Sequence, residues 1–129
     1  MRQEHLTESE NTGRGGPKIA VRVPVRTIDD IWREHGCPPV SVIKMDIEGG
    51  EAMALEGAID TLARDKPILI LEWNSENLKA YSVPPRELIQ ISARLGYIAY
   101  AFPGLTLINT EILLTMAMQQ TETFVLVPQ

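Results

Sequence analysis

The stretch Val40-Ser-Val-Ile-Lys-Met-Asp-Ile-Glu-Gly-Gly-Glu51 decides the fold class of this chain. Residues 40–47 are apolar at positions on both faces of an extended chain, which is typical of a central strand in a parallel sheet. Gly49 and Gly50 predict a tight turn into a helix. Apolar side chains then recur at helical spacing, at Leu55, Ala58, Ile59 and Leu62. The stretch therefore predicts a strand, a turn and a helix in direct succession.

The same alternation of elements continues toward the C-terminus. Residues 68–71 form a second near-continuous apolar strand that ends at Glu72, and a helix follows from the Pro84-Pro85 loop to about Leu95. Further strands are expected at 97–102 and 124–127, and residues 111–118 fit a strand or a helix. Two buried strands joined by a helix imply a right-handed parallel crossover, whereas the last two strands can pair antiparallel. The predicted class is α/β, with a partial doubly wound (Rossmann-like) sheet.

The N-terminal part has less pattern. Residues 1–17 are polar and end in Gly-Arg-Gly-Gly-Pro, so we predict a flexible leader before a single domain over residues 18–129. Residues 18–25 alternate between apolar and polar side chains and predict a half-exposed edge strand. Thr27 is expected to cap a short helix that carries Asp29 and Asp30 in its first turn, where the helix dipole favours negative charge.

Composition excludes several classes of function. The 129 residues carry a net charge of −5, which argues against non-specific binding to nucleic acid. Cys37 is the only cysteine, so an intrachain disulfide is excluded. The chain shows neither a secretory signal nor an apolar run approaching the ~20 residues of a membrane-spanning helix. We therefore expect a cytoplasmic protein without a membrane partner.

Carboxylates gather where the first apolar strand ends. Asp46, Glu48 and Glu51 lie at its carboxyl end, and ligands of open α/β sheets bind in the crevice beyond that end. Glu72 ends the next parallel strand and opens onto the same crevice. Such a group can bind a hard cation through oxygen ligands, or one member can act as a general base on a substrate hydroxyl. Glu51 also has a structural alternative, because a carboxylate in the first helical turn stabilises the helix by about 0.3–1 kcal/mol.

Two other interpretations are weaker. A metal-dependent hydrolase would need a histidine ligand set or a second metal cluster, which the sequence does not supply. The Gly-Arg-Gly-Gly run at 13–16 neither follows an apolar strand nor opens a helix, so it does not fit a dinucleotide loop.

Four segments in a fixed order resemble the FkbM family of S-adenosylmethionine-dependent methyltransferases, in which the element K-x-D-x-E-G-x-E is quite specific. The resemblance covers about residues 18–128. Its segments are Val25-Arg-Thr-Ile-Asp-Asp30, Val42-Ile-Lys-Met-Asp-Ile-Glu-Gly-Gly-Glu51, Ala54-Leu-Glu-Gly-Ala58 and Pro67-Ile-Leu-Ile-Leu-Glu72.

The resemblance implies a class I methyltransferase sheet with strand order 3-2-1-4-5-7-6. Val40–Asp46 would be strand four, Ile68–Glu72 strand five, and the last two strands six and seven, with flanking helices. It also implies methyl transfer from S-adenosylmethionine to a hydroxyl of a small molecule, a sugar or a lipid. The catalytic candidates are Asp46, beside the transferred methyl group, and the carboxylates Glu48, Glu51 and Glu72. Dependence on a divalent metal is left open.

The resemblance stops short of the cofactor loop. No residue matches the glycine-rich loop after strand one or the acidic residue that ends strand two, so cofactor-binding residues are not assigned. We therefore expect the C-terminal portion of a methyltransferase domain, inactive without its N-terminal half. Strand four would have an open edge, which predicts a homo-oligomer or pairing with a separate N-terminal half. The alternative is an inactive truncated domain that acts as an oligomerising interaction module.

Overall fold

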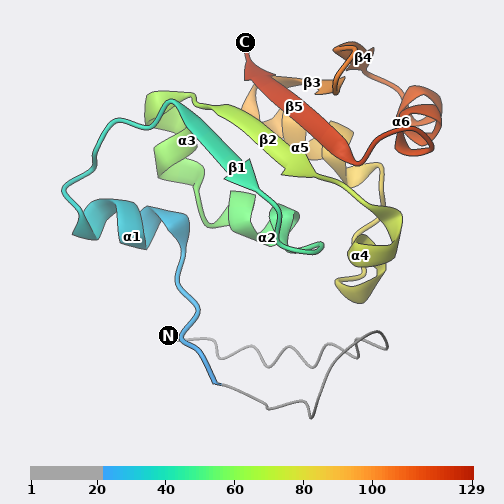
Figure 1. The fold of residues 1–129 in the computed structure, drawn as a ribbon. Helices are drawn as coiled ribbons and strands as arrows, with labels where there is room; N and C mark the ends of the chain where they lie inside the picture. The colour runs from blue at the N-terminus through green and yellow to red at the C-terminus, as the bar shows by residue number, and fades with distance from the viewer. Residues whose placement is uncertain (1–21) are drawn as a thin grey trace.

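A computed structural model describes residues 22–129, which form one mixed sheet flanked by helices (Figure 1). The sheet has five strands in the order β1-β2-β5-β3-β4. Their bounds are β1 Val42–Met45, β2 Ile68–Glu72, β3 Tyr97–Ala101, β4 Thr106–Ile108 and β5 Thr123–Pro128. The helices are α1 Ile28–Glu34, α2 Glu51–Glu56, α3 Ile59–Asp65, α4 Ser75–Ala80, α5 Glu87–Leu95 and α6 Glu111–Met118. The predicted α/β class is confirmed.

The strand pairing follows the predicted connections. β1 pairs with β2 in parallel, with Met45 opposite Leu71, and α2 and α3 form the crossover between them. β5 runs antiparallel to both of its neighbours, β2 and β3. The central position expected for the 40–47 strand is wrong in this structure, because within residues 22–129 no strand pairs with the outer edge of β1.

Several local predictions need correction. The helix expected after Gly50 is divided into α2 and α3 at Gly57, where an added Cβ would lie 3.2 Å from the side chain of Thr27. Helix α4 was expected to be loop, yet Asn74 caps it by accepting a hydrogen bond from the backbone N–H of Glu76 at 2.7 Å. Strand β4 was not expected, and the ambiguous segment 111–118 is the helix α6.

Only part of the predicted N-terminal strand can be compared with the structure. Residues 22–25 are not in a strand, and Val23 and Val25 are exposed. Residues 18–21, like the expected leader 1–17, lie outside the described residues.

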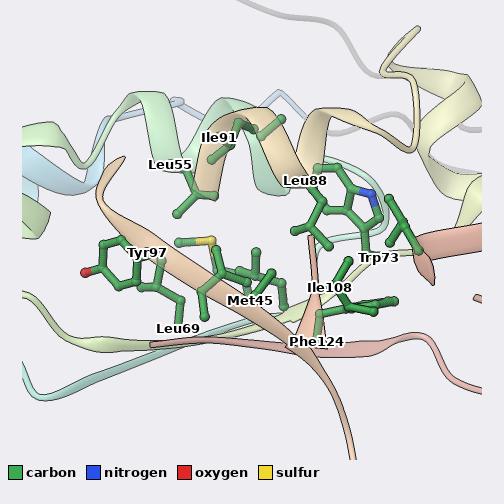
Figure 2. Close-up of a cluster of buried hydrophobic side chains, with 14 of the residues drawn as sticks. Met45, Leu55, Leu69, Trp73, Leu88, Ile91, Tyr97, Ile108 and Phe124 are labelled. Carbon is green, nitrogen blue, oxygen red and sulfur yellow. The ribbon is translucent and has the colours of Figure 1, made fainter. Parts of the chain in front are cut away.

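The hydrophobic core lies on one face of the sheet (Figure 2). Residues in register across three strands, such as Met45, Leu71 and Phe124, point to this face and are buried. Leu55 of α2 and Leu88 of α5 pack onto them from the helical layer and are also buried. Burial of this face is the main stabilising contribution, because each large apolar side chain contributes about 1.5–3 kcal/mol.

The opposite face of the sheet is apolar but exposed. Val42 and Ile68 lie opposite each other in register on this face and are 53% and 41% exposed. Val127 and Leu107 continue the apolar surface on β5 and β4. This distribution explains why the strands appear apolar on both faces in the sequence, while the structure buries only one of them.

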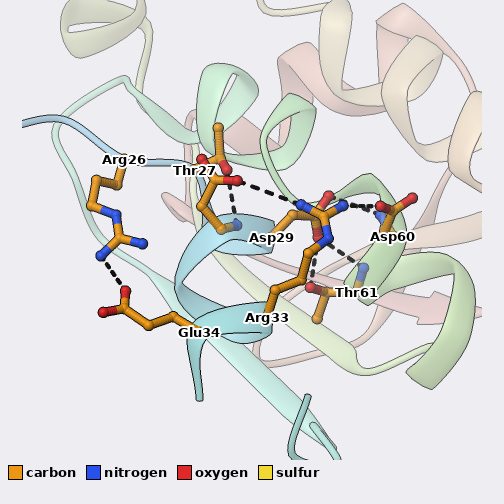
Figure 3. A network of polar contacts seen from close by, with 8 residues as sticks. Arg26, Thr27, Asp29, Arg33, Glu34, Asp60 and Thr61 are labelled. Carbon is orange, nitrogen blue, oxygen red and sulfur yellow. Dashed lines mark hydrogen bonds and ion pairs between the residues drawn. The ribbon is translucent and has the colours of Figure 1, made fainter. Parts of the chain in front are cut away.

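A buried carboxylate connects α1 to α3 (Figure 3). Both oxygens of Asp29 accept hydrogen bonds of 2.9 Å from the first backbone N–H groups of α3, at Asp60 and Thr61. The Thr61 hydroxyl donates a third bond of 2.7 Å, and Arg33 pairs with Asp60 beside it. Asp29 therefore caps a helix to which it does not belong, and the unpaired N–H groups of that helix are satisfied from a distance of 31 residues.

We predict that Asp29→Asn lowers the free energy of unfolding by about 1–3 kcal/mol, because it removes charge-assisted bonds from buried donors. Asp30→Asn is the matched control: it removes the same charge from the same helical turn, where the side chain is exposed, and should change stability by less than about 0.5 kcal/mol. Urea denaturation at pH 7 measures both. Equal losses would show that helix charge matters and the cap does not.

The contribution of Asp29 to stability should depend on pH, and the sign of this dependence follows from its pKa. Burial acts to raise the pKa of Asp29, but the hydrogen bonds from Thr61 and Asp60 outweigh it and hold that pKa below the ordinary value of 3.8. A lowered folded-state pKa stabilises the protein above the unfolded pKa, and this contribution is lost as the pH falls below it. The stability difference between the native chain and Asp29→Asn should therefore shrink as the pH falls below about 4.

Candidate active site

Two of the predicted carboxylates meet at the carboxyl edge of the sheet. Because Met45 lies opposite Leu71 in the parallel pair, the next residues, Asp46 and Glu72, leave the two strands side by side. A hydrogen bond from Glu72 lowers the pKa of Asp46, and the charge of Lys44 adds to this effect against partial burial. The Lys44 Nζ lies 3.6 Å from an Asp46 carboxylate oxygen. Asp46 is therefore the ionised partner of the pair.

Glu72 is the partner that retains a proton. Its shared hydrogen bond with Asp46 raises its pKa to about 7, and burial and the negative charges of Asp46, Glu122 and Glu48 act in the same direction. Two adjacent carboxylates do not both ionise freely, so Glu72 loses its proton at a higher pH than an isolated glutamic acid does. A group that titrates near the working pH is well suited to general acid–base chemistry.

Glu48 belongs to the turn between β1 and α2. Its carboxylate accepts a 2.6 Å hydrogen bond from the side-chain amide of Asn77, on α4. The turn itself is packed closely against that helix, because Gly49 has φ +102° and an added Cβ would lie 2.4 Å from the Asn77 carbonyl oxygen. A glycine is therefore required at position 49 by backbone conformation and by lack of space.

Glu51 has a different environment. Its side chain is fully buried, and one oxygen accepts a 2.9 Å hydrogen bond from the backbone N–H of Ile47. The other oxygen has no hydrogen-bond partner among the described residues. The contacts of Glu51 favour the structural alternative, in which it closes the 47–51 turn.

The carboxylates of this edge are thus distributed over three environments. Within residues 22–129, no group of three or more His, Cys, Asp or Glu side chains is arranged to hold a metal ion. The cation site considered for Asp46, Glu48 and Glu51 is therefore not formed by these side chains.

Residues that the sequence analysis did not select complete the edge. Glu122, just before β5, accepts a 2.6 Å hydrogen bond from the side chain of Asn74, and its carbonyl oxygen accepts a 2.7 Å bond from the backbone N–H of Trp73. Trp73 is fully buried and donates its indole N–H to Pro85 at 2.9 Å. The capping preference of asparagine was a usable signal for Asn74, whereas nothing local in the sequence connects Glu122 to this edge.

The glycine turn at this edge does not form a cofactor cradle. The space beside Gly49 is filled by the α4 backbone, and the side chain of Ile47 lies 3.4 Å from the Cβ position of Gly50. These two glycines therefore serve the packing of the chain itself, and their lack of side chains does not open a space for a ligand.

We predict that Glu72 titrates near pH 7 in the native chain and that Asp46→Asn lowers its pKa toward the ordinary value of 4.5. The substitution removes the adjacent negative charge that keeps Glu72 protonated. Carbon-detected NMR of the side-chain carboxyl group measures the titration. Glu76→Gln is the control, because Glu76 is exposed and paired with Lys79 and should leave the Glu72 titration unchanged. A Glu72 pKa near 4.5 in the native chain would contradict the shared proton.

Comparison with known proteins agrees with the motif at this edge. Residues 1–99 match the sequence model of the Methyltransferase FkbM domain. The 2-O-methyltransferase NoeI of Sinorhizobium fredii is 26% identical over 89 residues, which cover 69% of this chain and 35% of NoeI, so the chain spans about a third of that relative. No solved structure matches the chain. Because the domain match extends over more than half of the sequence, the chain belongs to the FkbM methyltransferase family.

Proposed function

We propose that this chain takes part in S-adenosylmethionine-dependent methyl transfer to a hydroxyl group of a small molecule, a sugar or a lipid. The observation that carries the proposal is geometric: the parallel register of β1 and β2 places Asp46, within the family's most specific motif, beside Glu72 at the end of the next strand. The strand order β1-β2-β5-β3 supports it, because it corresponds to the order 4-5-7-6 expected of a class I methyltransferase sheet. A relative named as a 2-O-methyltransferase supports a hydroxyl acceptor.

The pair would act as the general base. When bound, S-adenosylmethionine supplies an electrophilic methyl group, and an acceptor hydroxyl becomes a better nucleophile as it loses its proton. That proton would pass to Glu72 in its ionised form, with Asp46 sharing it through their hydrogen bond. Because the base must be ionised, the rate should increase as the pH rises through about 7.

The remaining requirements of the reaction would be met outside residues 22–129. The glycine turn offers no open space for the cofactor, and the relative NoeI has about two thirds of its length beyond the matched part. We therefore propose that the described residues supply the acceptor side of a complete methyltransferase.

The test uses a restored full-length enzyme that carries residues 22–129, assayed for transfer of labelled methyl groups to a panel of alcohols and sugars. Glu72→Gln should lower the rate by about 10²–10⁴-fold and remove the rise near pH 7, because the shared proton acceptor is lost. Glu76→Gln makes the same chemical change at an exposed ion pair and should leave the rate unchanged. A Glu72→Gln enzyme with full activity and an unchanged pH profile would refute the catalytic role.

We also propose that another polypeptide covers the exposed sheet face, either a second copy of this chain or a separate N-terminal half. The exposed Val42 and Ile68 lie near the edge of β1 with which no strand of residues 22–129 pairs, and contiguous exposed apolar surface of this kind marks interaction sites.

In the absence of a separate N-terminal half, we predict self-association. Size-exclusion chromatography with light scattering should give a mass above that of one chain. Ile68→Lys should shift the chain toward monomer by placing a charge on this face, whereas Ile112→Lys, at the more exposed Ile112 of α6, should not. A native chain that is monomeric at all concentrations would count against self-association.

A further inference from the structure

A hollow of about 370 Å³ lies at the same edge of the sheet as the carboxylate pair. The turn after β3 forms one wall with Phe102 and Pro103, and α6 forms the other with Leu113, Met116 and Ala117. Figure 1 shows α6 beyond the end of the sheet at which β5 begins. We refer to this space as the α6 hollow. Its volume is at the small end of the range for ligand pockets, which is about 300–1,000 Å³.

Residues 121–123 connect the α6 hollow to the carboxylate edge along the chain. Thr121 lines the hollow, and the next residue, Glu122, is hydrogen-bonded to Asn74 and is one of the charges that act on Glu72. The carbonyl oxygen of Thr123 accepts a 3.0 Å hydrogen bond from the backbone N–H of Phe102, which joins the two sides. A molecule in the hollow would therefore be separated from the proposed base by the start of β5, which lies between β2 and β3.

The lining of the hollow combines apolar side chains with uncharged polar ones. Phe102 and Met116 line the hollow from two different elements and are 50% and 56% exposed. An apolar ligand would remove this surface from water, at about 25 cal/mol for each Å² buried. Thr106, Gln120 and Thr121 add hydroxyl and amide groups to the lining, and the hollow contains no lysine, arginine or carboxylate. This composition suits a neutral molecule with an apolar body and one or more hydroxyl groups.

We propose that the α6 hollow binds the apolar ring or short chain of the methyl acceptor, so that a hydroxyl of the acceptor reaches the Asp46–Glu72 pair. The acceptor class is then a neutral, hydroxylated molecule with an apolar body, in contrast to a fully polar sugar or a charged metabolite. This inference rests on the proposed methyl transfer for its biological meaning, but binding to the hollow can be measured without it.

The test is an NMR titration of the full chain with benzyl alcohol and, in parallel, with glycerol. Both probes carry hydroxyl groups, but only benzyl alcohol has an apolar body. We expect saturable shifts of the backbone amides of Phe102, Leu113, Met116 and Thr121 with benzyl alcohol, and none with glycerol at the same concentration. Equal shifts with both probes, or shifts centred on Val42 and Ile68 of the sheet face, would overturn the proposal.

Two variants examine the site itself. Ala117→Trp fills the hollow and should weaken benzyl alcohol binding at least tenfold. Met116→Lys places a charge at an already exposed position of the wall and should also weaken it, so the test does not depend on whether the tryptophan variant folds. Ile112→Lys is the matched control, because Ile112 is exposed on the same helix and does not line the hollow. Unchanged binding in Met116→Lys would refute the site.

The remaining outcomes separate this inference from the others. Shifts of α6 that appear on raising the protein concentration alone would identify the hollow as a contact between copies, which overturns the ligand proposal. In the restored full-length enzyme, Met116→Lys should raise the KM for an apolar acceptor more than it lowers kcat, whereas Glu72→Gln should lower kcat. If Glu72→Gln does not lower kcat while benzyl alcohol still binds, the catalytic proposal is refuted and the binding proposal for the α6 hollow stands.

Discussion

The parallel register of β1 and β2 is the constraint on which the site depends. Pairing of Met45 with Leu71 places Asp46, just after β1, beside Glu72, the last residue of β2. A slip of one residue would turn Met45 away from the core and separate the two carboxylates. Burial of Met45 in the core therefore fixes the register of β1 on β2, and that register also determines which carboxylates lie side by side.

The family's motif residues perform different physical tasks. Asp29 caps a distant helix, Gly49 admits the backbone of α4, and Glu51 closes the turn from within the protein. Among the motif carboxylates within residues 22–129, Asp46 and Glu72 lie side by side and shift each other's pKa in opposite directions. A carboxylate in a motif can thus be required for the position of the backbone alone, and local hydrogen bonding distinguishes the two cases.

Hydrophobic periodicity predicted the two parallel strands, α5 and the antiparallel pairing of β3 with β5, because each of these elements presents an apolar pattern of its own. It did not predict α4, whose six residues bury only Leu78, or the three-residue β4. It could not indicate which face of the sheet is covered, since Val42 and Ile68 are as apolar as their buried neighbours. For the site, strand ends indicated Asp46 and Glu72. Glu122 could not be predicted from local sequence, because it lies 50 residues beyond Glu72 and reaches this edge only through the pairing of β2 with β5.

The reversed direction of β5 has a consequence for ligand choice. Because β5 runs antiparallel to β2, it begins at the edge of the sheet where β1 and β2 end. Glu122, just before β5, therefore lies at the same edge as Asp46, just after β1, and Glu72, at the end of β2. Asp46, Glu48 and Glu122 thereby create a region of negative potential around Glu72, and this potential contributes to its raised pKa. Electrostatic repulsion would disfavour phosphorylated or carboxylated compounds before any steric fit is tested, whereas uncharged or cationic molecules approach without this barrier. The direction of one strand would therefore influence which acceptors reach the proposed base.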